Sequence, residues 1–337
     1  MVQQAAISRI SSFPTQQTSG KLLPEKMSAL NIDITLNTGA KIPAVGFGTV
    51  CDEEFRYRFK DALKVAILEA GYRHIDTAWY YGTEKLIGEV LSELIGSGKI
   101  KREDIFVTTK VWPSLWNNPL KSLETSLKDL QLDYVDLLLQ HWPLAFDSGA
   151  EGKPAVPRDA DGNVRILDVD YLETWKKMID IYKNTGKAKA IGVSNYTVAM
   201  LKRLLDQTDV VPAAEQVELH PHLPQVELVQ FCKEHKIVVE AYSPLGSNGA
   251  PNLKIPVVQE LATKYGVHPV DILVNYHAQA GRVVLPRSQN VNRIRTGFKV
   301  VKLTAEELKK LDQFGVENPK RFITDSWGKN LGFEHWD

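Results

Sequence analysis

The sequence predicts an α/β protein built as one closed barrel of eight strand–helix units, a (β/α)8 or TIM barrel. Eight short β-branched runs alternate with amphipathic helical stretches along 337 residues, a length that such barrels reach as a single domain. Runs such as 135–139 carry apolar residues on both faces, which is typical of a parallel sheet covered by helices. No Gly-x-Gly-x-x-Gly follows any of these runs, so the usual dinucleotide fingerprint of an open doubly wound sheet is missing.

The predicted strands begin after residue 31 and follow one another at regular intervals. They span residues 44–49, 72–77, 105–110, 134–140, 189–194, 214–218, 237–242 and 283–286. Between them apolar residues recur at helical spacing, as at Leu63, Ala66, Ile67 and Ala70. Near the end of the chain, Thr304 and Glu307 have the spacing of a capping box and predict the start of a helix.

Three segments fall outside this regular pattern. Residues 1–30 contain no acidic residue before Glu25 and are predicted to be a flexible extension, with a mitochondrial presequence as the alternative. Residues 31–337 are then the barrel domain, including a C-terminal substrate loop. Insertions at 143–170 and 315–337 can both reach the C-terminal ends of the strands, where barrels hold their active sites.

Composition argues against several kinds of partner. Lys and Arg together number 41, as do Asp and Glu, so no basic surface for nucleic acid or membrane lipid is expected. There is no run of about 20 apolar residues of the kind that spans a membrane. Two cysteines, Cys51 and Cys232, are too few for a disulfide framework or a zinc site. We expect a cytoplasmic monomer that acts on a small molecule and holds no metal.

Ionisable side chains stand at the ends of successive predicted strands. The second strand ends at Asp76, with Tyr80 and Tyr81 close behind it, the third ends at Lys110, and the fourth runs into His141. Each residue alone has a structural explanation, such as a helix cap, packing or a solvated charge. Because the C-terminal ends of barrel strands converge on one mouth, their combination favours a catalytic site.

This set of groups suits proton donation to a carbonyl oxygen. A phenol has a pKa near 10 and is an intact acid at neutral pH, and a nearby ammonium such as Lys110 should lower that pKa. Asp76 could pair with Lys110, and His141 could hydrogen-bond the substrate oxygen. Trp112 and Trp142 follow the third and fourth strands and should wall an apolar pocket.

The order and spacing of these motifs resemble the aldo-keto reductase superfamily, and within it the fungal glycerol dehydrogenase and carbonyl reductase branch. The resemblance covers about residues 31–315 and rests on Gly71–Ala78 with Tyr81, Ile105–Trp112, Tyr134–Pro143, Ala190–Tyr196, Gln216–Pro221, Val239–Gly246 and Leu285–Ser288. It implies reduction of aldehydes and ketones to alcohols with NADPH, or polyol oxidation as the reverse reaction. It also implies a catalytic tetrad of Asp76, Tyr81, Lys110 and His141. Tyr81 is the implied proton donor because the family's donor lies five residues after the Asp.

The resemblance further implies where the cofactor and substrate bind. The cofactor positions are Thr49, Val50, Asp76, Ser194, Asn195, Gln216, Tyr242, Ser243, Leu245, Ser247, Arg287, Ser288, Gln289 and Arg293. Among these, Tyr242 would stack on the nicotinamide, and Arg287, Ser288 and Arg293 would hold the 2′-phosphate of NADPH, which guanidinium groups bind through charge-assisted hydrogen bonds. The substrate positions are Val50, Trp112, His141 and Trp142.

Some positions depart from the family pattern. Arg287 stands where Lys is usual, and Thr296 and Gly297 stand where an acidic residue and Asn are frequent. Val50 replaces a frequent Trp and should widen the pocket. Glu215 replaces an Asn just before Gln216, and a carboxylate so near the cofactor would need a partner.

Two other functional classes stay open at this point. The barrel could be a non-catalytic, cofactor-binding regulatory module, although a complete tetrad argues against that. It could also be a metal-dependent hydrolase, which needs clustered His, Asp or Glu ligands at the strand ends. Only His141 and Asp76 clearly qualify as such ligands.

Overall fold

The structure is a computed structural model in which residues 28–149 and 151–336 are described. In these residues eight parallel strands form one sheet in the order β12-β11-β10-β9-β6-β5-β4-β3. A parallel bridge between Val45 and Val284 joins its two edges and closes the barrel. The predicted (β/α)8 barrel is therefore confirmed. The strands are β3 (Phe47–Gly48), β4 (His74–Asp76), β5 (Phe106–Val111), β6 (Leu137–Gln140), β9 (Ile191–Ser194), β10 (Ala214–Glu218), β11 (Val238–Tyr242) and β12 (Val283–Leu285).

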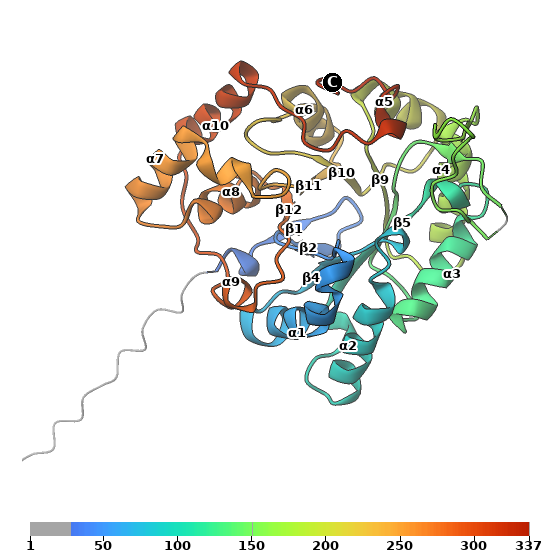
Figure 1. Cartoon of the computed structure of the whole chain (residues 1–337), viewed down its shortest axis with the longest axis horizontal. Helices are drawn as coiled ribbons and strands as arrows, with labels where there is room; N and C mark the ends of the chain where they lie inside the picture. Colours follow the sequence, from blue (N-terminus) through green and yellow to red (C-terminus); the bar gives the residue numbers. More distant parts are fainter. Residues whose placement is uncertain (1–27, 150, 337) are drawn as a thin grey trace, which may run out of the picture.

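Helices surround the barrel and cover the outer face of its strands (Figure 1). They are α1 (Arg56–Val65), α2 (Glu84–Gly96), α3 (Pro119–Leu130), α4 (Tyr171–Asn184), α5 (Val198–Gln207), α6 (Val226–Glu234), α7 (Pro256–Tyr265), α8 (Pro269–Ala278), α9 (Val291–Arg295) and α10 (Ala305–Glu317). Within the described parts of the chain, no helix is both long and apolar enough to cross a membrane. The predicted capping box is present at the start of α10, where Thr304 and Glu307 each accept a backbone N–H of the other.

The main core lies between the strands and this ring of helices. The apolar stripe of α3 shows how the sequence builds it, because Leu123, Leu127 and Leu130 are buried along one face. Helix α2 approaches α3 closely at Gly88, where an added Cβ would stand 2.2 Å from the carbonyl oxygen of Asp129. Only glycine fits that contact, so this one residue sets the spacing between the two helices.

A short hairpin that was not predicted closes the N-terminal end of the barrel. Its strands are β1 (Asp33–Thr35) and β2 (Lys41–Pro43), and Ile42 packs with Leu36, Phe106 and Val283 in a separate apolar cluster. Residues 28–30, the described part of the predicted extension, also pack on the barrel: Ser28 bridges to Lys299, and Ala29 and Leu30 are buried. Residues 1–27 lie outside the described residues.

The two predicted insertions meet at the opposite end. Residues 143–170 include the hairpin of β7 (Ala145–Phe146) and β8 (Ile166–Leu167), and the C-terminal segment includes the short turn η8 (Ser326–Gly328). The two segments share one aromatic cluster with the strand ends, in which the Trp112 and Trp327 rings lie 5.8 Å apart. This cluster positions the C-terminal segment beside the strand ends that carry the candidate catalytic groups.

Candidate active site

A cavity of about 780 Å³ opens at the carboxyl ends of the strands. Of the residues predicted for catalysis, cofactor and substrate, Lys110 is buried behind its wall and the others line it. The lining residues from that set are Thr49, Val50, Asp76, Tyr81, Trp112, His141, Trp142, Ser194, Asn195, Gln216, Tyr242, Ser243, Leu245, Ser247, Arg287, Ser288, Gln289 and Arg293.

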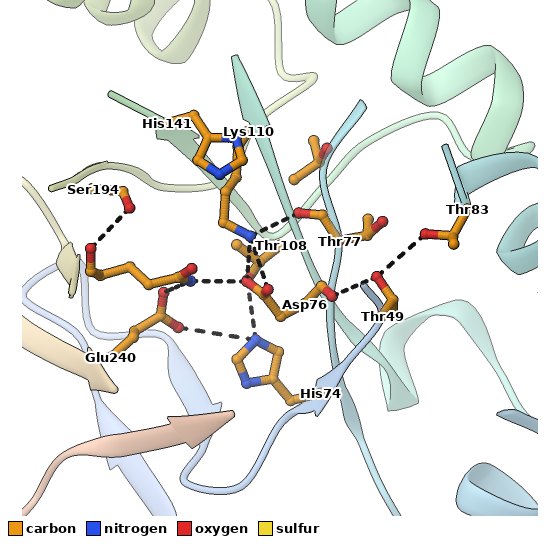
Figure 2. Close-up of polar contacts among 12 residues, drawn as sticks. Thr49, His74, Asp76, Thr77, Thr83, Thr108, Lys110, His141, Ser194 and Glu240 are labelled. Carbon is orange, nitrogen blue, oxygen red and sulfur yellow. Dashed lines mark hydrogen bonds and ion pairs between the residues drawn. The ribbon is translucent and has the colours of Figure 1, made fainter. Parts of the chain in front are cut away.

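Lys110 and Asp76 form a buried ion pair at the ends of β5 and β4 (Figure 2). The ammonium lies 2.8 Å from each carboxylate oxygen and also donates to the carbonyl oxygen of Thr77 at 2.9 Å. Burial disfavours the charged ammonium, but Asp76, Tyr81 and Glu240 outweigh that effect and raise the pKa of Lys110. The side chain is therefore held as a cation with its three donors largely satisfied.

Tyr81 lies over this ion pair, at the end of the turn η4 (Trp79–Tyr81). The Lys110 nitrogen is 4.9 Å from the centre of the phenol ring, and the His141 ring meets the same phenol edge-on at 5.6 Å. Burial raises the pKa of Tyr81, and Lys110 opposes this without reversing it. The expected effect of the Lys110 ammonium on this pKa is present, but burial is the larger effect and the net change is a rise. The phenol keeps its proton.

His141 is a buried, neutral imidazole. Burial and the charge of Lys110 hold its pKa well below the usual value. Neither ring nitrogen hydrogen-bonds to another described residue, and Nδ1 is fully buried. Its backbone is fixed, because the main-chain oxygen accepts a hydrogen bond from the Asn195 amide at 3.0 Å. The imidazole can therefore offer a neutral N–H to a ligand in the cavity.

A second polar layer, which the sequence did not predict, lies beneath the tetrad. The Gln216 amide nitrogen donates to Asp76 Oδ2 at 2.8 Å and to Glu240 Oε2 at 3.0 Å. The other Glu240 oxygen lies 4.0 Å from Nε2 of His74, which also contacts the Thr108 hydroxyl at 3.0 Å (Figure 2). Because two carboxyl groups bind the amide nitrogen, the amide oxygen of Gln216 is left to accept a bond from a ligand.

Burial keeps this second layer uncharged near neutral pH. It raises the pKa of Glu240 to about 8, with Asp76 adding to the effect, and lowers the pKa of His74 to about 4. The sequence signal for Glu240 was a single carboxylate within an apolar run, Val238–Tyr242. A lone charge in a fully buried strand indicates either a polar cluster inside the barrel or a contact with the helices.

Glu215, in β10, faces away from the barrel interior. Its carboxyl accepts a hydrogen bond from the backbone N–H of Tyr196 at 2.9 Å, and its charge would act on the thiol of Cys232 in α6. Side chains alternate along a strand, so Glu215 faces the helices while Gln216 faces the cavity. The expectation that this carboxylate lies near the cofactor is therefore wrong. Burial raises its pKa well above the usual value.

Hydroxyl and amide groups at the ends of β9, β10 and β11 form one linked row. Tyr242 donates to Asn195 Oδ1 at 2.9 Å, and the Asn195 amide nitrogen also contacts the Ser194 hydroxyl at 3.1 Å. Ser194 in turn donates to the main-chain oxygen of Gln216 at 2.8 Å. Asn195 has a φ of 63°, a left-handed conformation that Asn tolerates better than most residues. This row holds the Tyr242 ring at the cavity wall.

Two arginines stand at the far end of the cavity. Arg287 reaches across to the main-chain oxygen of Val50 at 3.1 Å and lies 3.8 Å from the Asp52 carboxylate. The Arg293 guanidinium has no hydrogen bond or ion pair to any described residue. The Arg293 side chain is therefore free to bind an anionic ligand.

The cavity wall also includes residues to which the sequence analysis gave no role in the site. Tyr80 stacks flat on Trp112, with ring centres 3.7 Å apart, and Asp325 and Trp327 come from the C-terminal segment. Val50 lines the cavity and is 43% exposed. Over residues 28–149 and 151–336, no group of three or more His, Cys, Asp or Glu is placed to hold a metal ion.

Comparison with known proteins agrees with this geometry. The model of the Aldo/keto reductase family matches residues 45–315, which is most of the chain. The chain belongs to the aldo/keto reductase family. A Glycerol 2-dehydrogenase (NADP(+)) of Saccharomyces cerevisiae is 44% identical over 304 residues, covering 87% of this chain and 94% of the relative. A D-galacturonate reductase of Hypocrea jecorina is 41% identical over 306 residues, covering 88% and 96%.

A structural relative gives the same result for the fold. The aldose reductase of Schistosoma japonicum superposes with a TM-score of 0.80 at 32% sequence identity, covering 90% of this chain and 97% of that chain. The resemblance noted in the sequence, to this family and to its fungal glycerol dehydrogenase branch, is thus confirmed.

Proposed function

We propose that this aldo/keto reductase family member reduces aldehydes and ketones to alcohols with NADPH. The observation that carries the proposal is the convergence of a protonated phenol, a buried Lys110–Asp76 ion pair and a neutral His141 on one cavity. The names of its relatives, which include an NADP(+)-linked dehydrogenase, support the same chemistry. Oxidation of a polyol is the reverse reaction and would use the same groups.

The residues around the cavity fit NADPH. The free amide oxygen of Gln216 and the ring of Tyr242 suit the carboxamide and face of a nicotinamide, and unpaired Arg293 suits a phosphate. When bound, NADPH supplies a hydride to the carbonyl carbon. The remaining chemistry falls to the protein.

Tyr81 and His141 would bind the carbonyl oxygen between them. As negative charge grows on that oxygen, Tyr81 gives up its proton, and the Lys110 ammonium behind the ring stabilises the phenolate that results. Asp76 keeps Lys110 charged and in place. The tryptophan wall, with Trp112 1% exposed, keeps water away from the reacting centre.

The test of the catalytic assignment is Tyr81→Phe, which removes the acid and keeps the ring. We expect kcat for an aromatic aldehyde to fall at least about 100-fold, the usual scale of a lost general acid. The Kd for NADPH, read from quenching of protein fluorescence, should stay within about twofold of wild type. Unchanged turnover would refute the role of Tyr81. A wild-type protein that bound NADPH and reduced no aldehyde would favour the regulatory module.

The test of the cofactor assignment is Arg293→Ala, measured with both nicotinamide cofactors. Affinity for NADPH should fall about tenfold or more, while affinity for NADH, which lacks the 2′-phosphate, should change little. Arg295→Ala is the matched control, because Arg295 lies in the same helix and pairs with Glu69 outside the cavity. Equal losses for both cofactors would refute the phosphate contact.

A further inference from the structure

The substrate end of the cavity has a polar feature that the reduction of a carbonyl does not require. Asp325 and Tyr80 line the same cavity as Trp112 and Trp327, and neither belongs to the groups that would act on the carbonyl oxygen. We propose that Asp325 and Tyr80 form a hydroxyl-binding subsite that selects polyhydroxylated carbonyl compounds, such as small sugars, over apolar aldehydes. This inference rests on the proposed function, because it concerns the substrate of the same cavity.

The carboxylate of Asp325 is placed without a partner. It makes no hydrogen bond or salt bridge to any residue in the described part of the chain, although burial raises its pKa. Asp325 is the N-cap of η8, a position where Asp usually accepts a backbone N–H, yet its side chain makes no such bond. A partly buried carboxylate without a donor is costly. A ligand with hydroxyl donors would remove that cost.

The position of Asp325 is fixed by hydrogen bonds from the backbone just before it in the chain. Glu218, at the end of β10, accepts the backbone N–H of Phe322 at 2.7 Å and that of Ile323 at 3.0 Å. His220 lies 2.9 Å from the same buried carboxylate, and Arg321 lies 3.8 Å from it. The segment that carries Asp325 is therefore attached to the barrel and does not depend on solvent-exposed contacts.

Tyr80 supplies the second polar group and an aromatic surface. Its ring is parallel to that of Trp112 within 1°, and the residue is 40% exposed. Burial and then the charge of Asp325 raise the pKa of its hydroxyl, so the two groups lie within electrostatic range. The hydroxyl makes no hydrogen bond to a described residue. An aromatic face beside a carboxylate and a phenol offers apolar contact for C–H groups and acceptors for O–H groups.

The distance from the reacting centre suggests the length of the substrate. Trp112 meets His141 edge-on at 4.9 Å, and Tyr80 lies on the flat side of Trp112. Tyr80 is thus separated from His141 by one aromatic ring. A five-carbon aldehyde can hold its carbonyl at His141 while its distal carbons approach Tyr80 and Asp325.

The experiment compares D-xylose with pentanal, two aldehydes of equal chain length, in wild type and in Asp325→Leu. Hydrogen bonds to a charged acceptor usually contribute enough to change affinity tenfold or more. We therefore expect kcat/KM for D-xylose to fall at least about tenfold while that for pentanal stays within about twofold. The small open-chain fraction of xylose is the same for both proteins and cancels. Asp325→Asn and Tyr80→Phe, which preserve shape, should each lower the xylose-to-pentanal ratio by a smaller factor.

Glu334→Gln is the matched control, since it removes one negative charge from the exposed part of the same segment. It should leave the ratio unchanged. Equal loss of both substrates in all three variants would overturn the subsite, and so would an unchanged ratio. Either result leaves the proposed function standing if wild type reduces pentanal with NADPH. Failure of wild type to reduce either aldehyde would instead refute the proposed function.

Discussion

The buried carboxyl of Glu240 makes stability depend on pH in a way that one substitution should remove. Burial raises its pKa in the folded protein from 4.5 to about 8. Between those two values the unfolded chain loses this proton while the folded chain keeps it, so stability falls as pH rises through the window. At 1.36 kcal/mol per unit, the full effect is at most about 5 kcal/mol. The amide of Glu240→Gln does not titrate, so the free energy of unfolding of this variant should not show this part of the decline with pH.

The assay is urea unfolding followed by tryptophan fluorescence at pH 5, 7 and 9. Wild type should lose at least about 2 kcal/mol more than Glu240→Gln between pH 5 and 9, with most of the difference present by pH 8. Both proteins should keep some decline, because burial also raises the pKa of Glu84 to about 7 and that of Glu215 well above its usual value.

The control for this prediction is Glu69→Gln. Glu69 is exposed and its pKa is lowered by a hydrogen bond from Arg295, so its contribution to stability is lost only as pH falls below its unfolded value of 4.5. Between pH 5 and 9 the free energy of unfolding of Glu69→Gln should change with pH as that of wild type does. If Glu240→Gln also ran parallel to wild type, Glu240 would not be titrating inside the barrel and the reasoning would be refuted.

Two further changes test the ion pair and the helix packing. Lys110→Met should lower kcat at least about 100-fold and destabilise the protein by about 3 kcal/mol, because Asp76 then stays buried without its cation. Activity assays measure the first effect and urea unfolding measures the second. Gly88→Ala should lower the free energy of unfolding by about 1–3 kcal/mol, because its Cβ meets the Asp129 carbonyl, whereas Gly96→Ala in the same helix meets nothing and should be neutral or stabilising.

The barrel could be predicted from the sequence because its strands are short, buried and evenly spaced. Predicted boundaries differed mainly at the strand starts, as for 134–140 against the observed β6 (Leu137–Gln140), since Val135 makes only an isolated bridge there. The hairpin of β1 and β2 escaped prediction because each strand has three residues and only Ile42 is fully buried. Such short pieces owe their form to tertiary packing and leave little periodicity to detect.

The candidate site, like the fold, could be predicted only in part. Asp76, Lys110 and His141 could be placed because each ends a barrel strand, and all barrel strands end at one mouth. Glu215 and Glu240 are both carboxylates within buried barrel strands, β10 and β11. One faces the helices and the other faces Gln216, a difference that depends on strand register, which the sequence pattern alone does not define.

The arrangement of charges inside the barrel explains why so many ionisable groups can share one buried site. With Glu240 protonated and both His74 and His141 neutral, Lys110 and Asp76 are the two full charges at this centre, and they cancel. Because these charges cancel, the centre has no net positive charge that would favour the Tyr81 phenolate. The phenol therefore keeps its proton until it donates that proton to the substrate oxygen. Once it gives that proton up, Lys110 faces two anions, and the new phenolate is stabilised in a place where water could not do so. The neutrality of the second layer is therefore part of what makes the phenol usable as an acid.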